Sequence, residues 1–128
     1  MAKILIDTSI IIDHLRLKDK KQTILYKLFQ NDHQLFISIL TYAESYAGKS
    51  IWQIKKAKTI LKDILSSIKT LPIEENLSEK AGQISALYNV DIVDAIIAAT
   101  ALEHKLELVT LNIKDFEKIE GLKLRKKT

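Results

Sequence analysis

The sequence predicts an α/β fold, a three-layer α/β/α sandwich with a central, mostly parallel sheet. Two observations support this fold: short, continuously apolar runs recur along the chain, and helical patterns lie between them. Strands and helices that alternate in this way form right-handed βαβ units. The chain has 128 residues, 47% of them hydrophobic, with three glycines, one proline and no repeat. We therefore expect a single domain over residues 1–128.

The predicted strands are short apolar runs that end at polar or turn residues. The first covers residues 3–7, Lys3-Ile-Leu-Ile-Asp7, and its apolar stretch ends at an acid, as in a strand buried on both faces of a parallel sheet. Similar runs lie at 34–38, 68–72 and 107–110, and a short last strand is expected at 122–124.

Helical patterns fill the intervals, and several of their ends carry capping signals. Ser38 is expected to cap the helix that follows the second strand, Gly48 to end that helix in the left-handed C′ conformation, and Ser50 to cap the next helix. The predicted helices cover about residues 10–16, 20–31, 39–47, 51–67, 75–88 and 92–105, with a short turn at 113–118.

The helix predicted over residues 92–105 is apolar nearly all round in its first three turns and is rich in alanine. Such a helix is buried, and its alanines let the backbone approach the sheet closely. Asp94 is the lone charged residue of that apolar stretch. Because an unpaired carboxylate in apolar surroundings is costly, Asp94 indicates function more strongly than any other single residue.

Composition narrows the classes of function. The absence of cysteine excludes a disulfide framework and a thiolate zinc site, and the three histidines are scattered and form no ligand pair. The net charge of +4 suits a polyanionic partner, although a codon bias toward A and T would give the same excess of lysine. The N-terminal apolar run meets Asp7 after three residues, too early for a signal peptide or membrane span, which predicts a soluble cytoplasmic protein.

Four polar residues are expected at the carboxyl ends of the parallel strands, where ligands bind in open α/β sheets: Asp7, Glu44, Asp94 and Asn112. Three carboxylates in one half-buried cleft repel one another unless a cation compensates them. Oxygen ligands without histidine or cysteine indicate a hard divalent ion, Mg²⁺ or Mn²⁺. An ion of this kind activates water and neutralises a phosphate, so the cluster favours phosphodiester hydrolysis.

Each of these residues also has an ordinary structural interpretation. Asp7 could cap a helix, Glu44 could be a solvated helix residue, and Asn112 could be a turn residue. Asp94 is the hardest of the four to explain in this way.

Four segments, taken together, carry a resemblance to a known family. They are Ile4-Leu-Ile-Asp-Thr-Ser9, Ile37-Ser-Ile-Leu-Thr-Tyr-Ala-Glu44, Asp94-Ala-Ile-Ile-Ala-Ala-Thr-Ala101, and Leu108-Val-Thr-Leu-Asn112 followed by Lys114-Asp-Phe116 and Gly121-Leu122. In their order, spacing and total length they resemble the PIN domain family and, within it, the VapC toxins of type II toxin–antitoxin modules. The resemblance covers essentially the whole chain and implies a PIN-like fold, Mg²⁺-dependent endoribonuclease activity, an antitoxin partner and a homodimer.

The resemblance also implies roles for individual residues. Asp7, Glu44 and Asp94 match the three principal acids of the family: Asp7 and Asp94 would hold the metal, and Glu44 would act through the metal or its waters. Asn112 stands where the family often has a fourth acid, which puts a tightly held second metal in doubt. The supporting candidates, which would orient ligands or supply charge, are Thr8, Ser9, Thr110, Asp91 and Asp115.

Three other functions are consistent with parts of this pattern. A PIN ribonuclease of RNA maturation or decay would carry the same residues without a toxin role. A signalling receiver requires an adjacent acid pair after the first strand, whereas Asp7 is followed by Thr8 and Ser9. A non-catalytic nucleic-acid-binding module would need only the basic charge, and the three acids argue against it because carboxylates repel phosphates in the absence of a metal.

Overall fold

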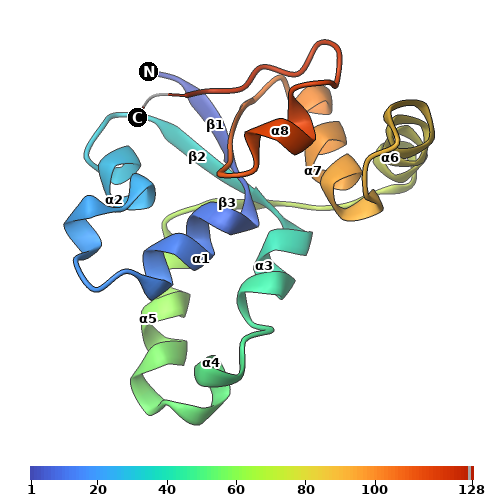
Figure 1. Ribbon diagram of the computed structural model, residues 1–128. Helices are drawn as coiled ribbons and strands as arrows, with labels where there is room; N and C mark the ends of the chain where they lie inside the picture. The colour runs from blue at the N-terminus through green and yellow to red at the C-terminus, as the bar shows by residue number, and fades with distance from the viewer. Residues whose placement is uncertain (127) are drawn as a thin grey trace.

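A four-stranded parallel sheet forms the centre of the molecule in the computed structural model, which describes residues 1–126 and 128 (Figure 1). The strands are β1 (Lys3–Ile6), β2 (Gln34–Ser38), β3 (Lys69–Leu71) and β4 (Glu107–Val109), in the order β3-β2-β1-β4. All three strand pairs are parallel, so the carboxyl ends of the four strands meet at one edge. The predicted α/β class and parallel sheet are confirmed.

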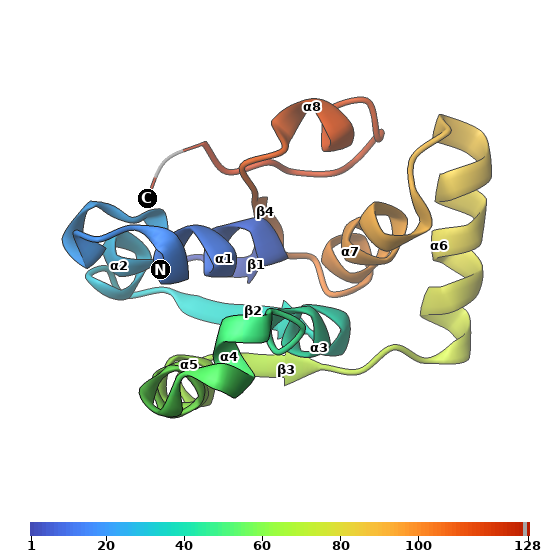
Figure 2. The ribbon, with the colours of Figure 1, turned by 60° about the horizontal axis from the view of Figure 1, so that its bottom comes forward.

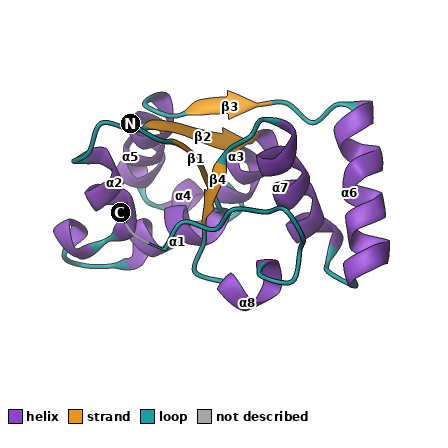
Figure 3. Ribbon diagram, turned by 90° about the horizontal axis from the view of Figure 1, so that it is seen from above, coloured by secondary structure: helices purple, strands orange, loops and turns teal. Residues whose placement is uncertain are grey.

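The helices are α1 (Thr8–Arg16), a 3-10 turn η1 (Lys20–Gln22), α2 (Ile24–Phe29), α3 (Ile39–Ser45), α4 (Lys49–Gln53), α5 (Lys55–Ser66), α6 (Glu75–Tyr88), α7 (Ile92–Glu103) and α8 (Ile113–Phe116). Figures 2 and 3 show α7 beside the sheet and α6 beyond it, at one end of the molecule.

Alternate residues of β1 enter two separate cores, one on each face of the sheet, as the period of two in a strand requires. Ile4 and Ile6 pack into a cluster with residues of α1, α2, α4 and α5. Leu5, between them, packs into a second cluster with residues of α6, α7 and α8. The two clusters are the two interfaces of a three-layer sandwich, which confirms the predicted layer order.

Helix α7 is buried as predicted, with Ala95, Ala98 and Ala99 fully inaccessible to solvent. Among the described residues, no single helix is long and apolar enough to cross a membrane. Helices α6 and α7 reach that length and hydropathy only as a pair, and their axes are bent by 119°.

Two predicted helices are each interrupted by a residue in an extended conformation. The prediction of one helix over 20–31 is wrong because buried Thr23 (φ −78°, ψ 152°) separates η1 from α2, and its hydroxyl accepts a hydrogen bond from the Tyr26 amide at 3.1 Å. The prediction over 51–67 is wrong because Ile54 (φ −103°, ψ 116°) separates α4 from α5.

The capping predictions have mixed outcomes. Ser38 caps α3 as expected, and its hydroxyl accepts a hydrogen bond from the Leu40 amide at 3.1 Å. Gly48 is not left-handed: with φ −71° and ψ 137° it is the N-cap of α4, so Ser50 lies inside that helix and does not cap it. The expected last strand at 122–124 is reduced to one parallel bridge, between Leu108 and Leu124.

Candidate active site

Asp7 lies directly after β1 and before α1, and only 5% of its surface is exposed. Its Oδ2 atom accepts two hydrogen bonds, from Ser9 Oγ at 2.8 Å and from Thr110 Oγ1 at 2.7 Å. The side chain makes no capping hydrogen bond to α1, which contradicts its interpretation as a simple helix cap. Among the described residues Oδ1 has no hydrogen-bond donor. One carboxylate oxygen is thus fixed, while the other remains available to a ligand.

The hydroxyls around Asp7 also tie β4 to the start of α1. Ser9 Oγ accepts a hydrogen bond from the Leu111 amide at 3.1 Å, and Thr110 Oγ1 accepts one from the Asn112 amide at 3.0 Å. The Asp7 amide itself donates to the Val109 carbonyl at 3.0 Å. Since each hydroxyl both donates to Asp7 and accepts from the turn after β4, the position of the carboxylate is determined by two elements.

Glu44 projects from α3 toward the start of α1. Its Oε1 atom accepts a hydrogen bond of 2.6 Å from the Thr8 hydroxyl, which also lies 2.9 Å from Thr41 Oγ1. Thr41 is completely buried, one helical turn before Glu44. Sequence reasoning missed Thr41, since its partner Thr8 is 33 residues away and only the fold brings the two together.

Asp94 is half-buried in the first turn of α7, and no described residue donates a hydrogen bond to it. Burial, followed by the negative charges of Asp7, Asp115, Asp91 and Glu44, raises the pKa of Asp94 from 3.8 to about 6. The fold has therefore brought four acids, three of them from other segments of the chain, close enough to act on one carboxylate.

The remaining predicted residues lie at the exposed rim of the site. Asn112 precedes α8 and its side chain does not cap that helix. Asp91 precedes α7, again without a side-chain cap, and Asp115 belongs to α8. Asp91 and Asp115 contribute to the raised pKa of Asp94, so they are electrostatically part of the cluster. The catalytic and supporting roles of all these residues stay predictions.

The donor set fits a hydrated Mg²⁺ ion better than a metal enclosed by protein. Within residues 1–126 and 128, no three acidic or histidine side chains are arranged to hold a metal ion by themselves. Mg²⁺ usually takes one or two carboxylates and keeps several waters. The unbonded oxygen of Asp7 and the uncompensated carboxylate of Asp94 meet that requirement with oxygen donors alone.

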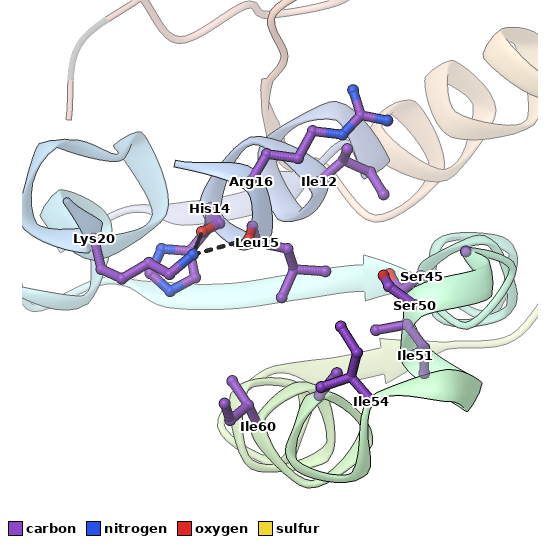
Figure 4. A pocket seen from close by; sticks show the side chains of 12 residues that line it. Ile12, His14, Leu15, Arg16, Lys20, Ser45, Ser50, Ile51, Ile54 and Ile60 are labelled. Atoms are coloured by element: carbon purple, nitrogen blue, oxygen red, sulfur yellow. Dashed lines mark hydrogen bonds between the residues drawn. The ribbon is translucent and has the colours of Figure 1, made fainter. Parts of the chain in front are cut away.

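Two hollows lie near α1. One, of about 300 Å³, is mainly apolar and separates α1 from α4 and α5; none of the acids named above lines it (Figure 4). The other, of about 360 Å³, borders the acid cluster and is lined by Ser9 and Asn112 as well as by the C-terminal half of α1.

Comparison with known proteins places this architecture in a family. The PIN domain family model matches residues 4–122. Ribonuclease VapC19 of Mycobacterium tuberculosis is 29% identical over 117 residues, which cover 88% of this chain and 90% of the relative. A toxin–antitoxin complex from Klebsiella pneumoniae superposes with a TM-score of 0.78 at 29% identity, covering 98% and 99% of the two chains. DNA-bound VapBC from Salmonella typhimurium has the same fold, with a TM-score of 0.79 at 24% identity and 98% coverage of both chains. The chain therefore belongs to the PIN domain family.

Proposed function

We propose that this PIN domain is an Mg²⁺-dependent endoribonuclease and the toxin of a VapBC-type toxin–antitoxin pair. The main support for this proposal comes from Asp94, a half-buried carboxylate whose pKa is raised to about 6 by burial and by four neighbouring acids. Such a cluster is stable when a cation binds to it. The names of the relatives, ribonuclease VapC19 and a toxin–antitoxin complex, support RNA as the substrate and an antitoxin as the partner.

Asp7 and Asp94 would hold the metal, and Glu44 would reach it through water. When bound, Mg²⁺ (or Mn²⁺) lowers the pKa of a water and neutralises charge on the scissile phosphate. Ser9 and Thr110 fix Asp7 by donating to its Oδ2 atom. Thr8 fixes Oε1 of Glu44. Oε2 of Glu44 would then be the oxygen that accepts a hydrogen bond from the attacking water and orients it.

The partner proposal is supported by the apolar cleft between α1 and α4–α5. Ile12, Ile51, Ile54 and Ile60 line it, and Ile54 and Ile60 are exposed (Figure 4). An antitoxin segment with apolar side chains would cover this surface. An Arg or Lys of the same segment would pair with the acids that otherwise hold the metal, which would inactivate the enzyme.

The dimer proposal is supported by exposed apolar side chains on α3, α6 and α7. Figures 2 and 3 show α6 and α7 at one end of the molecule, with α3 nearer the sheet. Each of these helices carries one large exposed apolar residue: Ile39 begins α3, Leu87 lies in the last turn of α6, and Ile92 begins α7. A second copy of the chain would cover them. Size-exclusion chromatography with light scattering measures the oligomeric state, and Leu87→Glu should shift it toward the monomer.

The deciding experiment is RNA cleavage by the purified chain with Mg²⁺ and then with excess EDTA. We expect cleavage with Mg²⁺, loss of it with EDTA, and recovery on adding Mn²⁺. Binding without cleavage would indicate a non-catalytic nucleic-acid module. The toxin role is tested by expressing the chain alone and together with the adjacent gene: strong cleavage in vitro without any effect on growth would favour a PIN ribonuclease of RNA processing or decay.

A further inference from the structure

The hollow of about 360 Å³ beside the acid cluster is a groove along α1. Its lining includes Ser9 near the start of that helix, Arg16 and Leu17 at its end, and Leu111 and Asn112 from the turn after β4. Ser9 and Arg16 are seven residues apart, so the groove extends about 10 Å along the helix axis at 1.5 Å per residue. One of its ends therefore lies at the acid cluster and the other lies at Arg16.

One side chain, that of Ser9, fixes the position of the groove relative to the acid cluster. Ser9 Oγ donates to Asp7 Oδ2 at 2.8 Å and accepts from the Leu111 amide at 3.1 Å. The first contact orients a predicted metal ligand, and the second fixes the opposite wall of the groove. A strand lying in the groove would therefore be positioned relative to Asp7 by rigid contacts.

The far end of the groove offers a free cation. Within residues 1–126 and 128, Arg16 forms no ion pair. Arg16 also lines the apolar cleft between α1 and α4–α5, but Figure 4 shows its guanidinium extending away from Ile54 and Ile60 on the other side of that cleft. Leu17 and Leu111 are exposed beside it. Asp13 also lines the groove. The carboxylate of this residue would accept a hydrogen bond from a ribose 2′-hydroxyl or a base N–H group of a bound RNA.

We propose that this groove binds the RNA strand on one side of the scissile phosphate, with Arg16 donating to a neighbouring phosphate of the same strand. The inference rests on the proposed ribonuclease function and names a substrate subsite for it. The scissile phosphate must lie at the acid cluster. Arg16, about 10 Å from that cluster along the helix axis, would therefore contact a second phosphate. Leu17 and Leu111 supply apolar surface for the intervening base or ribose.

The test compares Arg16→Gln with Lys18→Gln, which removes the same charge from an exposed position outside the groove. Both changes are made in the full chain carrying Asp94→Asn to prevent cleavage, and the dissociation constant of a short single-stranded RNA is measured against salt. Loss of one charge-assisted contact predicts about tenfold weaker binding for Arg16→Gln. The salt slope should fall by about 0.7, the value for one phosphate on a single strand. Lys18→Gln should change neither quantity.

A second measurement locates the phosphate. RNAs carrying one neutral methylphosphonate linkage, moved stepwise away from the cleavage site, are cleaved by the protein with Asp94 intact. At one position the neutral linkage should lower the cleavage rate of the wild type about tenfold. The same linkage should not lower the rate of Arg16→Gln any further, since both changes remove the same contact.

Several results would overturn the groove assignment. Equal RNA binding by the Arg16→Gln and Lys18→Gln proteins would do so. A loss of thermal stability with unchanged RNA binding would also do so, because Arg16 would then act only as a stabilising charge at the C-terminal end of α1. Weakened antitoxin binding with unchanged RNA binding would make it a protein contact. If the wild type neither binds nor cleaves RNA, the proposed function itself fails, and this subsite fails with it.

Discussion

Replacing Asp94 by Asn separates the contribution of that residue to function from its contribution to stability. The substitution keeps the shape of the side chain and removes a charge that burial, Asp7 and three other acids make unfavourable. We expect the metal-free variant to be more stable than the wild type at neutral pH, and to be inactive toward RNA. It should also lose most of the stabilisation by Mg²⁺, because one of the two proposed direct ligands is gone.

The magnitude follows from the raised pKa. The difference between 3.8 and about 6 corresponds to at most about 3 kcal/mol of unfolding free energy. Because solvent reaches the half-buried cleft and screens the charges, about 1–2 kcal/mol is the realistic gain. For a chain of this length, each kcal/mol shifts the melting temperature by about 3–5 °C. Mg²⁺ at a hundred times its dissociation constant should stabilise the wild type by about 2.7 kcal/mol and the variant by little.

The pH dependence identifies the cause of the gain. The folded wild type binds the Asp94 proton more tightly than the unfolded chain does, so ionisation lowers its stability as the pH rises from about 4 to about 6. The advantage of Asp94→Asn should therefore be absent below that window and complete above it. Thermal melts in EDTA and in Mg²⁺ across this range measure both effects. A variant that is weakened at neutral pH, still responds to Mg²⁺ and still cleaves RNA would refute the site assignment.

Three further substitutions test the structure around this residue. Thr110→Val removes a donor to Asp7 and an acceptor for the Asn112 amide, and should lower the unfolding free energy by about 1.5–3 kcal/mol in a denaturant titration; unchanged stability would mean that the hydroxyl network carries little energy. Thr8→Val should reduce kcat about 10- to 100-fold with RNA affinity unchanged, and Thr8→Ser should restore it, because only the hydroxyl orients Glu44. Ala98→Leu should destabilise the protein by about 1–3 kcal/mol in thermal melts through overpacking under α7, whereas Ala86→Leu on the exposed side of α6 should not.

The parts of the fold that were predicted well are those in which local pattern and tertiary packing agree. The strand over 34–38 and the helix over 75–88 have the predicted bounds, since an uninterrupted pattern fills each. The breaks at Thr23 and Ile54 were missed because apolar residues continue at helical spacing through both positions. At Thr23 the hydroxyl competes for a backbone amide and favours a cap, a choice that depends on burial by the rest of the chain.

The candidate site also contains residues that local sequence pattern reveals and residues that only the fold brings together. Asp94 could be identified from the sequence because a lone charge in an apolar helix conflicts with its surroundings at short range. Thr41 and the groove at Arg16 could not be identified, because each acquires its meaning from partners distant in the chain. Thr41 meets Thr8 across 33 residues, and Arg16 shares its groove with the turn after β4.

The two proposed metal ligands are held in opposite ways, and this difference explains how the cluster can bind a cation without being assembled by it. Two hydroxyl donors compensate Asp7, so its position is set before any ion arrives. Asp94 receives no such donor from the described residues, and its charge remains unfavourable until a cation binds. A donor added beside Asp94 would stabilise the metal-free protein and weaken cation binding together. Asp94, whose charge the fold leaves uncompensated, thus supplies most of the attraction for the metal. Asp7, whose charge the two hydroxyls compensate, sets the geometry of the site.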